Sequence, residues 1–136
     1  MKKSEIRDKF TSLLKEKFDN VEDKMYFPDE HAQLSNAFPY VTIVFGSWTP
    51  QGNALYGTQT LSIIGITQGD NDTLTERIDE MENDIFSAIH KKEIQLNITE
   101  VNNTNLFAPF GLEAGLFPPF GGVRFEITVS NVKVAI

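Results

Sequence analysis

Two segments of the chain carry apolar side chains on both faces of a strand, and this feature restricts the fold more than any other. Tyr40–Phe45 reads YVTIVF, a β-branched and aromatic run with apolar residues at odd and even positions. Thr58–Thr67 shares the feature, with Leu61 and Ile63 on one face and Ile64 and Ile66 on the other. Successive strand side chains point to opposite faces, so such runs are typical of inner strands. We therefore expect both segments in a sheet, with Tyr40–Phe45 buried on both faces.

Two amphipathic helices flank these strands in the sequence. The first, Ser4–Phe18, has an apolar stripe made of Ile6, Phe10, Leu13 and Leu14. The second runs from Thr73 to His90, and its stripe comprises Leu74, Ile78, Met81, Ile85 and Ile89, widened by Phe86. Two helices cannot cover both faces of a broad sheet, so we expect them together on one face.

Two further strands are predicted in the second half of the chain. Ile94, Leu96 and Ile98 alternate with polar residues, as in a strand with one buried face. In the last strand, Val123–Ile136, the apolar residues are odd-numbered up to Val129 and even-numbered from Val132 through Val134. Either one extra residue forms a β-bulge between Val129 and Val132, or the strand crosses from one packing surface to another. This strand is longer than typical and is expected to reach beyond its own sheet.

The connections complete the predicted order of elements. Gly46–Gly57, with three glycines and Pro50, is predicted to be a turn or tip, and Met25–Phe27 is a candidate short strand ended by Pro28. The order is then helix, strand, strand, helix, strand, strand. We predict one α+β domain spanning residues 1–136, with a mainly antiparallel sheet, two helices packed on one face and a long aromatic loop.

That loop is Leu106–Gly122, LFAPFGLEAGLFPPFGG, with four phenylalanines, three prolines and four glycines. So many prolines and glycines cannot continue a helix or an inner strand, yet a solvated loop has no use for so many aromatic rings. The loop is expected to pack over its own sheet or against another copy of the protein. Its candidate contact residues are Phe107, Phe110, Phe117 and Phe120. Trp48 and Tyr56, in the Gly46–Gly57 tip, are likewise expected either to fold back onto their own sheet or to contact a partner.

Charge and composition exclude several classes of protein. The net charge of −7, without a basic stripe, is unfavourable for non-specific nucleic-acid binding, although a surface that lets DNA pass can be acidic. The chain has no cysteine and hence no disulfide, thiolate metal site or cysteine nucleophile. Its start, MKKSEIRDKF, lacks the apolar core of a signal peptide, and no apolar run approaches the length of a membrane span. These features fit a chain made in a reducing cytoplasm.

Candidate chemical sites are few, and each has a simpler structural explanation. Asp70-Asn71-Asp72 lacks the glycine and closing glutamate of a calcium loop and is typical of a turn before a helix. Asp29-Glu30-His31 is separated in sequence from His90, so a metal or acid–base pair is weakly supported. No nucleophile elbow, phosphate-binding loop or dinucleotide fingerprint is present. We predict no enzyme activity, no catalytic or metal-binding residue and no cofactor.

The layout resembles the tail terminator (minor tail or tail-completion) proteins of long-tailed bacteriophages and phage-tail-like particles. The resemblance is one of element order and length, and it covers most of the chain. It is carried by SEIRDKFTSLLKEKF, FPYVTIVFGSW, LSIIGIT, TLTERIDEMENDIFSAIH and GGVRFEITVSNVKVAI. The aromatic loop matches no motif of the family.

The resemblance implies a structural virion protein that forms a hexameric ring. Such a ring caps the tail tube, stops its polymerisation and joins the tail to the head, with tube and neck proteins as partners and DNA passing through without specific binding. It implies a protein of the virion, assembled in the host cytoplasm, with no membrane partner. The end of the last strand, with Val132 and Val134, would supply a subunit contact beside the aromatic loop.

Two alternatives remain open at the level of sequence. Another neck or head-completion component is the closest. The other is a small-ligand or regulatory domain, because a helix-strand-strand order repeated twice is compatible with a permuted ferredoxin-like layout. An enzyme would need carboxylates or a histidine converging in a cleft.

Overall fold

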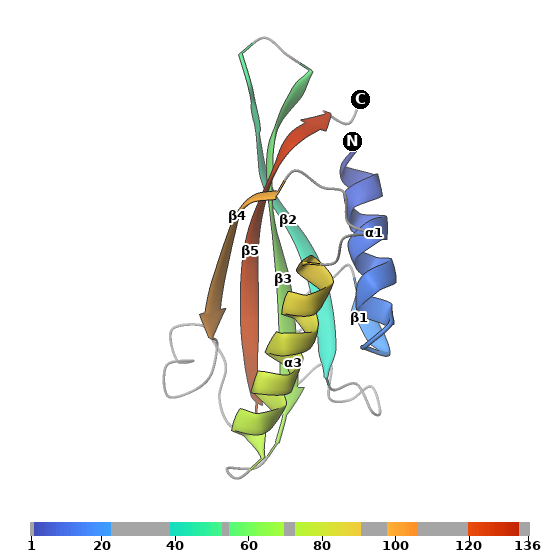
Figure 1. The fold of residues 1–136 in the computed structure, drawn as a ribbon, viewed down its shortest axis with the longest axis vertical. Helices are drawn as coiled ribbons and strands as arrows, with labels where there is room; N and C mark the ends of the chain where they lie inside the picture. The colour runs from blue at the N-terminus through green and yellow to red at the C-terminus, as the bar shows by residue number, and fades with distance from the viewer. Residues whose placement is uncertain are drawn as a thin grey trace.

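The computed structural model describes residues 2–22, 39–52, 55–69, 73–90, 98–105 and 120–133. Its helices are α1 (Lys3–Lys15) and α3 (Leu74–Ile89), and its strands are β1 (Asn20–Glu22), β2 (Tyr40–Pro50), β3 (Tyr56–Gln68), β4 (Ile98–Asn105) and β5 (Phe120–Lys133). The strands form one sheet in the order β1-β2-β3-β5-β4, in which only the β1–β2 pair is parallel. Figure 1 shows this sheet behind the two helices, which confirms the predicted α+β class.

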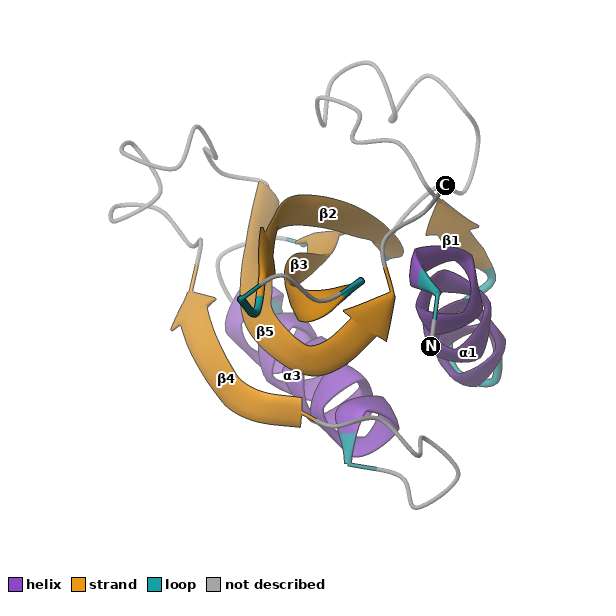
Figure 2. Cartoon of the chain, turned by 90° about the horizontal axis from the view of Figure 1, so that it is seen from above, coloured by secondary structure: helices purple, strands orange, loops and turns teal. Residues whose placement is uncertain are grey.

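Both helices pack against one face of the sheet and share one apolar core. The helices contribute Ile6, Phe10 and Leu14 of α1 and Met81, Ile85, Ala88 and Ile89 of α3. The sheet contributes Val41, Ile43, Leu61, Ile63, Val123, Phe125, Ile127, Val129 and Val132. Seen from above, α1 lies beside β1, and α3 lies across β3 and β5 (Figure 2). The predicted placement of the helices on one face is therefore confirmed.

The centre of the sheet is buried on both faces, as the two-faced strands predicted, although the prediction is wrong at Val44, which is 38% exposed. Tyr40, Ile64 and Ile66 form a second buried cluster. They alternate along their strands with Val41, Ile63 and other members of the main core, so they point away from the helices. Burial of each such side chain contributes about 1.5–3 kcal/mol to folding. These strands are held by both faces rather than by one.

Gly65 lets α3 approach the centre of this sheet closely. A Cβ atom at this position would lie 2.7 Å from the Met81 sulfur and 2.9 Å from Ile85 Cδ1. Real Cβ atoms do not approach other atoms so closely, because the interior is already packed to crystal density. Gly65 therefore sets how tightly the helix packs on β3.

Several predicted boundaries in the first half of the chain are wrong. α1 ends at Lys15 rather than Phe18, and a strand not anticipated from the sequence, β1, follows at Asn20–Glu22. Three residues are too few to show a periodic pattern, and β1 exists through its parallel pairing with Tyr40–Thr42. The candidate strand Met25–Phe27 lies outside the described residues.

The fourth and fifth strands also differ from prediction. β4 begins at Ile98 and runs through polar residues to Asn105, whereas Ile94 and Leu96 lie outside the described residues. β4 lies at the edge of the sheet, where polar side chains are tolerated. Its polar sequence therefore resembles that of a loop. β5 begins at Phe120, because the backbones of residues 120–122 pair with β3 in spite of the two glycines.

The topology is that of a circularly permuted ferredoxin-like sheet with β1 added at its edge. β3 and β4 are joined through α3 and lie on either side of β5, which is the split β-α-β unit. β2 completes the sheet on the other side of β3. The permutation would join the end of β5 to the start of α1, and Lys133 indeed forms a bridge with Lys2. Closely spaced ends of this kind are what permit permutation.

Three register shifts lie side by side across the sheet, and we call them the belt. β2 carries one extra residue between Phe45 and Trp48, β5 one between Val129 and Val132, and β4 one between Ile98 and Glu100. The shift in β5 is the predicted β-bulge, and it keeps Val129 and Val132 on the same core face. Asn131 within it has φ = 57°, the left-handed conformation that asparagine tolerates.

Candidate subunit-contact surface

Beyond the belt, β2 and β3 continue as a hairpin, described over residues 48–52 and 55–59, which we call the arm. The end of β5 pairs with its β3 strand at Tyr56 and Gly57. The sequence predicted a turn or tip here, but Trp48–Pro50 and Gly57–Gln59 are paired strand residues. Figure 1 shows the arm rising beyond the body of the molecule. Leu55 and Tyr56 near the tip are 55% and 45% exposed. The arm thus presents apolar surface to solvent, which is typical of a contact site.

Trp48 folds back onto its own sheet. Its indole Nε1–H donates a hydrogen bond to the Val132 carbonyl at 3.0 Å, and its ring packs on the main core. Val132 itself is only 1% exposed. Of the predicted contact residues, Val132 is therefore buried and Trp48 partly buried within one subunit, and the two join the base of the arm to the end of β5.

Gln59 ties the base of the arm to the belt. Its side chain is fully buried, and Nε2 donates to the carbonyls of Gly46, Ser47 and Thr60 at 3.1, 3.3 and 2.7 Å. The bulge in β2 removes ladder partners from this backbone, and the amide replaces them. Gln59 is not among the residues predicted from the sequence, although its position carries a signal. It has the odd parity of Leu61 and Ile63, so a polar group falls on the core face.

The aromatic loop lies largely outside the described residues. Phe107, Phe110 and Phe117 are not described, nor is Val134. Phe120 is described only through its backbone, which pairs with Gln68 at the first position of β5. Their roles as contact residues stay predictions. Of the predicted set, Tyr56 is the member whose exposed side chain the structure places on the arm.

The helix-free face of the sheet carries a polar cleft of about 340 Å³. Arg124 of β5 forms an ion pair with Glu126, and its Nε donates to the Ser62 hydroxyl at 3.3 Å. Asn102 of β4 donates to Glu100 at 2.9 Å. These polar groups satisfy one another along neighbouring strands. The cleft is therefore a hydrogen-bonded ladder rather than a set of groups directed at one ligand atom.

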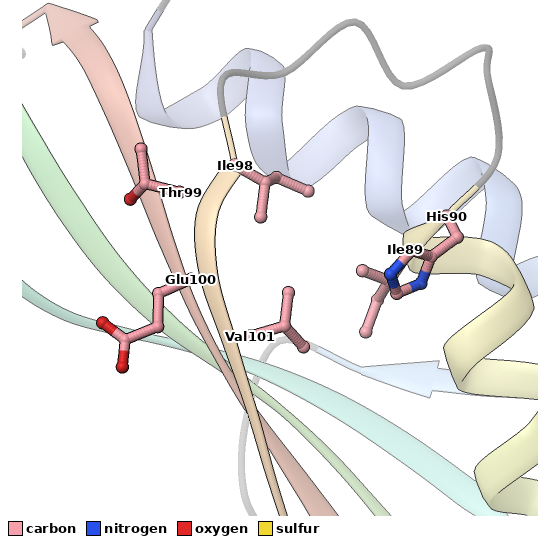
Figure 3. Close-up of a pocket in the computed structure, with 6 residues that line it drawn as sticks. All are labelled: Ile89, His90, Ile98, Thr99, Glu100 and Val101. Carbon is pink, nitrogen blue, oxygen red and sulfur yellow. The ribbon is translucent and has the colours of Figure 1, made fainter.

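A second hollow lies between the end of α3 and the bulge in β4. It measures about 270 Å³ and is lined by Ile89, His90, Ile98, Thr99, Glu100 and Val101. Figure 3 shows Ile98 and Val101 pointing toward α3, while Glu100 points away from His90. His90 stacks on Phe86 with ring centroids 4.1 Å apart, and its Nδ1 lies 3.0 Å from the Phe86 carbonyl. A histidine at a helix end explains this arrangement without a catalytic partner.

The remaining chemical candidates add no site within the described ranges. Asp70-Asn71-Asp72 and Asp29-Glu30-His31 lie outside the described residues. Among the residues that are described, no group of three or more His, Asp or Glu side chains could hold a metal ion. Neither described helix is long and apolar enough to span a bilayer.

Comparison with known proteins adds no relative. No protein-family model matches the chain, and no curated protein matches it.

Proposed function

We propose that this protein is a structural subunit of a ring, the tail terminator of a long-tailed bacteriophage or a tail-like particle. The observation that carries the proposal is the arm, a hairpin of β2 and β3 that extends beyond the belt and exposes Leu55 and Tyr56 near its tip. The resemblance in element order and length supports the same conclusion. The fold by itself does not, because one fold serves many functions.

The arm suits contact between copies of one chain. In a heterologous contact, a patch on one subunit binds a different patch on the next, and repetition closes a ring. Residues 48–50 of β2 form the outer strand of the arm among the described strands, so a neighbour could add a strand there. The apolar tip would then be buried by the neighbour.

In this role the ring ends tail-tube growth and joins the tail to the neck, and the protein is part of the virion. The tube protein and the neck proteins are its partners beyond other copies of itself. DNA passes through the ring without specific binding, which suits a net charge of −7.

The direct test is native mass spectrometry of the purified chain, alone and mixed with tail tubes. We expect a ring, and we expect Leu55→Ser/Tyr56→Ser to shift the population toward monomers without lowering Tm by more than a few degrees. Val44→Ser is the matched control, because Val44 is also exposed but lies in the body, off the arm. A chain that stays monomeric with and without tubes contradicts the proposal.

Gene deletion separates the terminator from another neck component. Loss of a terminator gives overlong tails without heads, visible by electron microscopy. Loss of a head-completion protein gives tails of normal length and heads that leak DNA. A ligand-binding domain would give neither defect.

A further inference from the structure

The fold gathers four cations that are not all neighbours in sequence, and we call this group the basic end. Lys2 forms a backbone bridge with Lys133, which brings the start of α1 to the end of β5 (Figure 1). Lys3 Nζ and Arg7 Cζ lie 5.4 and 4.8 Å from the centroid of the Phe45 ring. The chain as a whole has twelve cationic and nineteen carboxylate side chains, so the basic end is a positive region on a net negative protein.

Among the residues that the structure describes, no carboxylate forms an ion pair with the basic end. Lys3 and Arg7 are four residues apart on one face of α1, while Glu5 falls between them and points to the other side. The amino-terminal end of the α1 dipole adds further positive potential. Bringing a partner's carboxylates here would be favourable.

The complementary surface is on α3 of the same chain. Glu76, Asp79 and Glu80 are exposed and form a stripe opposite the buried residues of that helix. Arg77 is the single cation of α3, and its Nη1 donates to the Gln68 carbonyl at 2.5 Å. We call the stripe the acidic face. It lies in the first half of α3, which Figure 1 places at the opposite end of the body from the start of α1.

We infer that the basic end of one copy docks on the acidic face of α3 in a second copy. The two surfaces lie at opposite ends of one chain, so they meet between copies, head to tail. Repetition of such a contact closes a ring when the rotation between copies allows it. The inference rests on the proposed function and names the charged surfaces of its subunit contact.

A second copy fits the basic end better than nucleic acid does. Non-specific DNA binding requires many cations that neutralise successive phosphates. Here four cations stand on a chain whose net charge of −7 repels a polyanion. An acidic helix face of limited length matches a basic group of this size.

The test is a charge swap followed by sedimentation velocity and native mass spectrometry. We expect Lys2→Glu/Lys133→Glu to weaken self-association by about tenfold, and Asp79→Lys/Glu80→Lys to do the same. The four substitutions together should restore association to within about threefold of wild type, because the attractive pairs are rebuilt with reversed sign. Association of the wild type should also fall with rising salt concentration.

Matched controls separate docking from folding. Lys15→Glu/Lys17→Glu reverses two exposed lysines at the far end of α1 and should leave association unchanged. Each variant's Tm is measured alongside, and glutamate at position 2 favours the helix dipole, so folding is preserved. If Lys2→Glu/Lys133→Glu does not fold, Lys2→Gln/Lys133→Gln replaces it. Because this variant removes the charges instead of reversing them, it should weaken self-association by about threefold rather than tenfold.

Four results overturn the inference. The first two are that both reversals leave assembly unchanged and that the fourfold swap fails to restore it; in either case the ring is built on other surfaces and the proposed function stands. A labelled DNA duplex bound by the wild type, and released by Lys2→Glu/Lys133→Glu without change in assembly, makes the basic end a nucleic-acid site. A wild type that is monomeric with and without tail tubes ends the proposed function as well.

Discussion

The body of the sheet and the arm are built from the same two strands, yet they are stabilised differently. In the body, β2 and β3 are covered on both faces except around the exposed Val44, and their side chains enter two buried clusters. In the arm, the same strands are narrow, and the tip exposes Leu55 and Tyr56. The belt separates the two regions. The body and the arm therefore do not differ in strand propensity. They differ in how many faces of the two strands are covered by other parts of the protein.

The largest effect should come from removing the centre of the body. Phe125 is fully buried beneath α3, and Phe125→Ala should lower the free energy of unfolding by about 3–5 kcal/mol, through lost burial and the cavity left behind. Urea unfolding measures it. Phe86→Ala, at a half-exposed ring on the same helix–sheet boundary, should cost about 1 kcal/mol or less. Equal losses would show that the body is not packed as described.

Overpacking the body should have the next largest effect. Gly65→Ala should cost about 1–3 kcal/mol, because the added methyl group meets Met81 and Ile85. In a double-mutant cycle, Met81→Ala should cost less in the Gly65→Ala background than in the wild type. Additive costs would mean that α3 moves as a whole to accept the methyl group.

Breaking the belt should loosen the arm before the body. Gln59→Met keeps the volume but leaves the bulge carbonyls of β2 without their amide donor, at a cost of about 1–3 kcal/mol. Hydrogen exchange should speed up at residues 48–49 and 57–59 more than at residues 61–66. Gln68→Met, at an exposed position of the same strand, should leave exchange unchanged. Uniform acceleration along β3 would refute a separate arm.

The smallest effect is expected at the bulge of β5. Asn131→Val should cost about 1–2 kcal/mol, because a β-branched residue is strained at φ = 57°. Asn131→Gly should cost much less, since glycine adopts this conformation freely. The single tryptophan, Trp48, bonds to neighbouring Val132, so its fluorescence reports the local change. Equal costs for valine and glycine would mean that backbone conformation is not what Asn131 supplies.

Much of the fold was predictable because it rests on periodic burial. The stripes of both helices and the two faces of Leu61–Ile66 are visible as apolar spacing, and so is the bulge, as the change of parity after Val129. β1 and the polar part of β4 after Ile98 were not predicted, because a three-residue strand and a polar edge strand carry no such spacing. The candidate surface was harder still. Tyr56 was identified as an aromatic residue in a tip, but Trp48 turned inward.

By itself, the sequence determined which residues are apolar and with what period, and hence the helices, the two-faced strands, the α+β class and the position of the bulge. The tertiary structure decided what depends on distant parts of the chain. Lys133 meets Lys2, Gln59 meets the bulge carbonyls, and the hairpin outgrows the body to become an arm. The physical reason is range. Periodicity records burial along one element, whereas register, strand order and the gathering of charges arise only when separate elements pair.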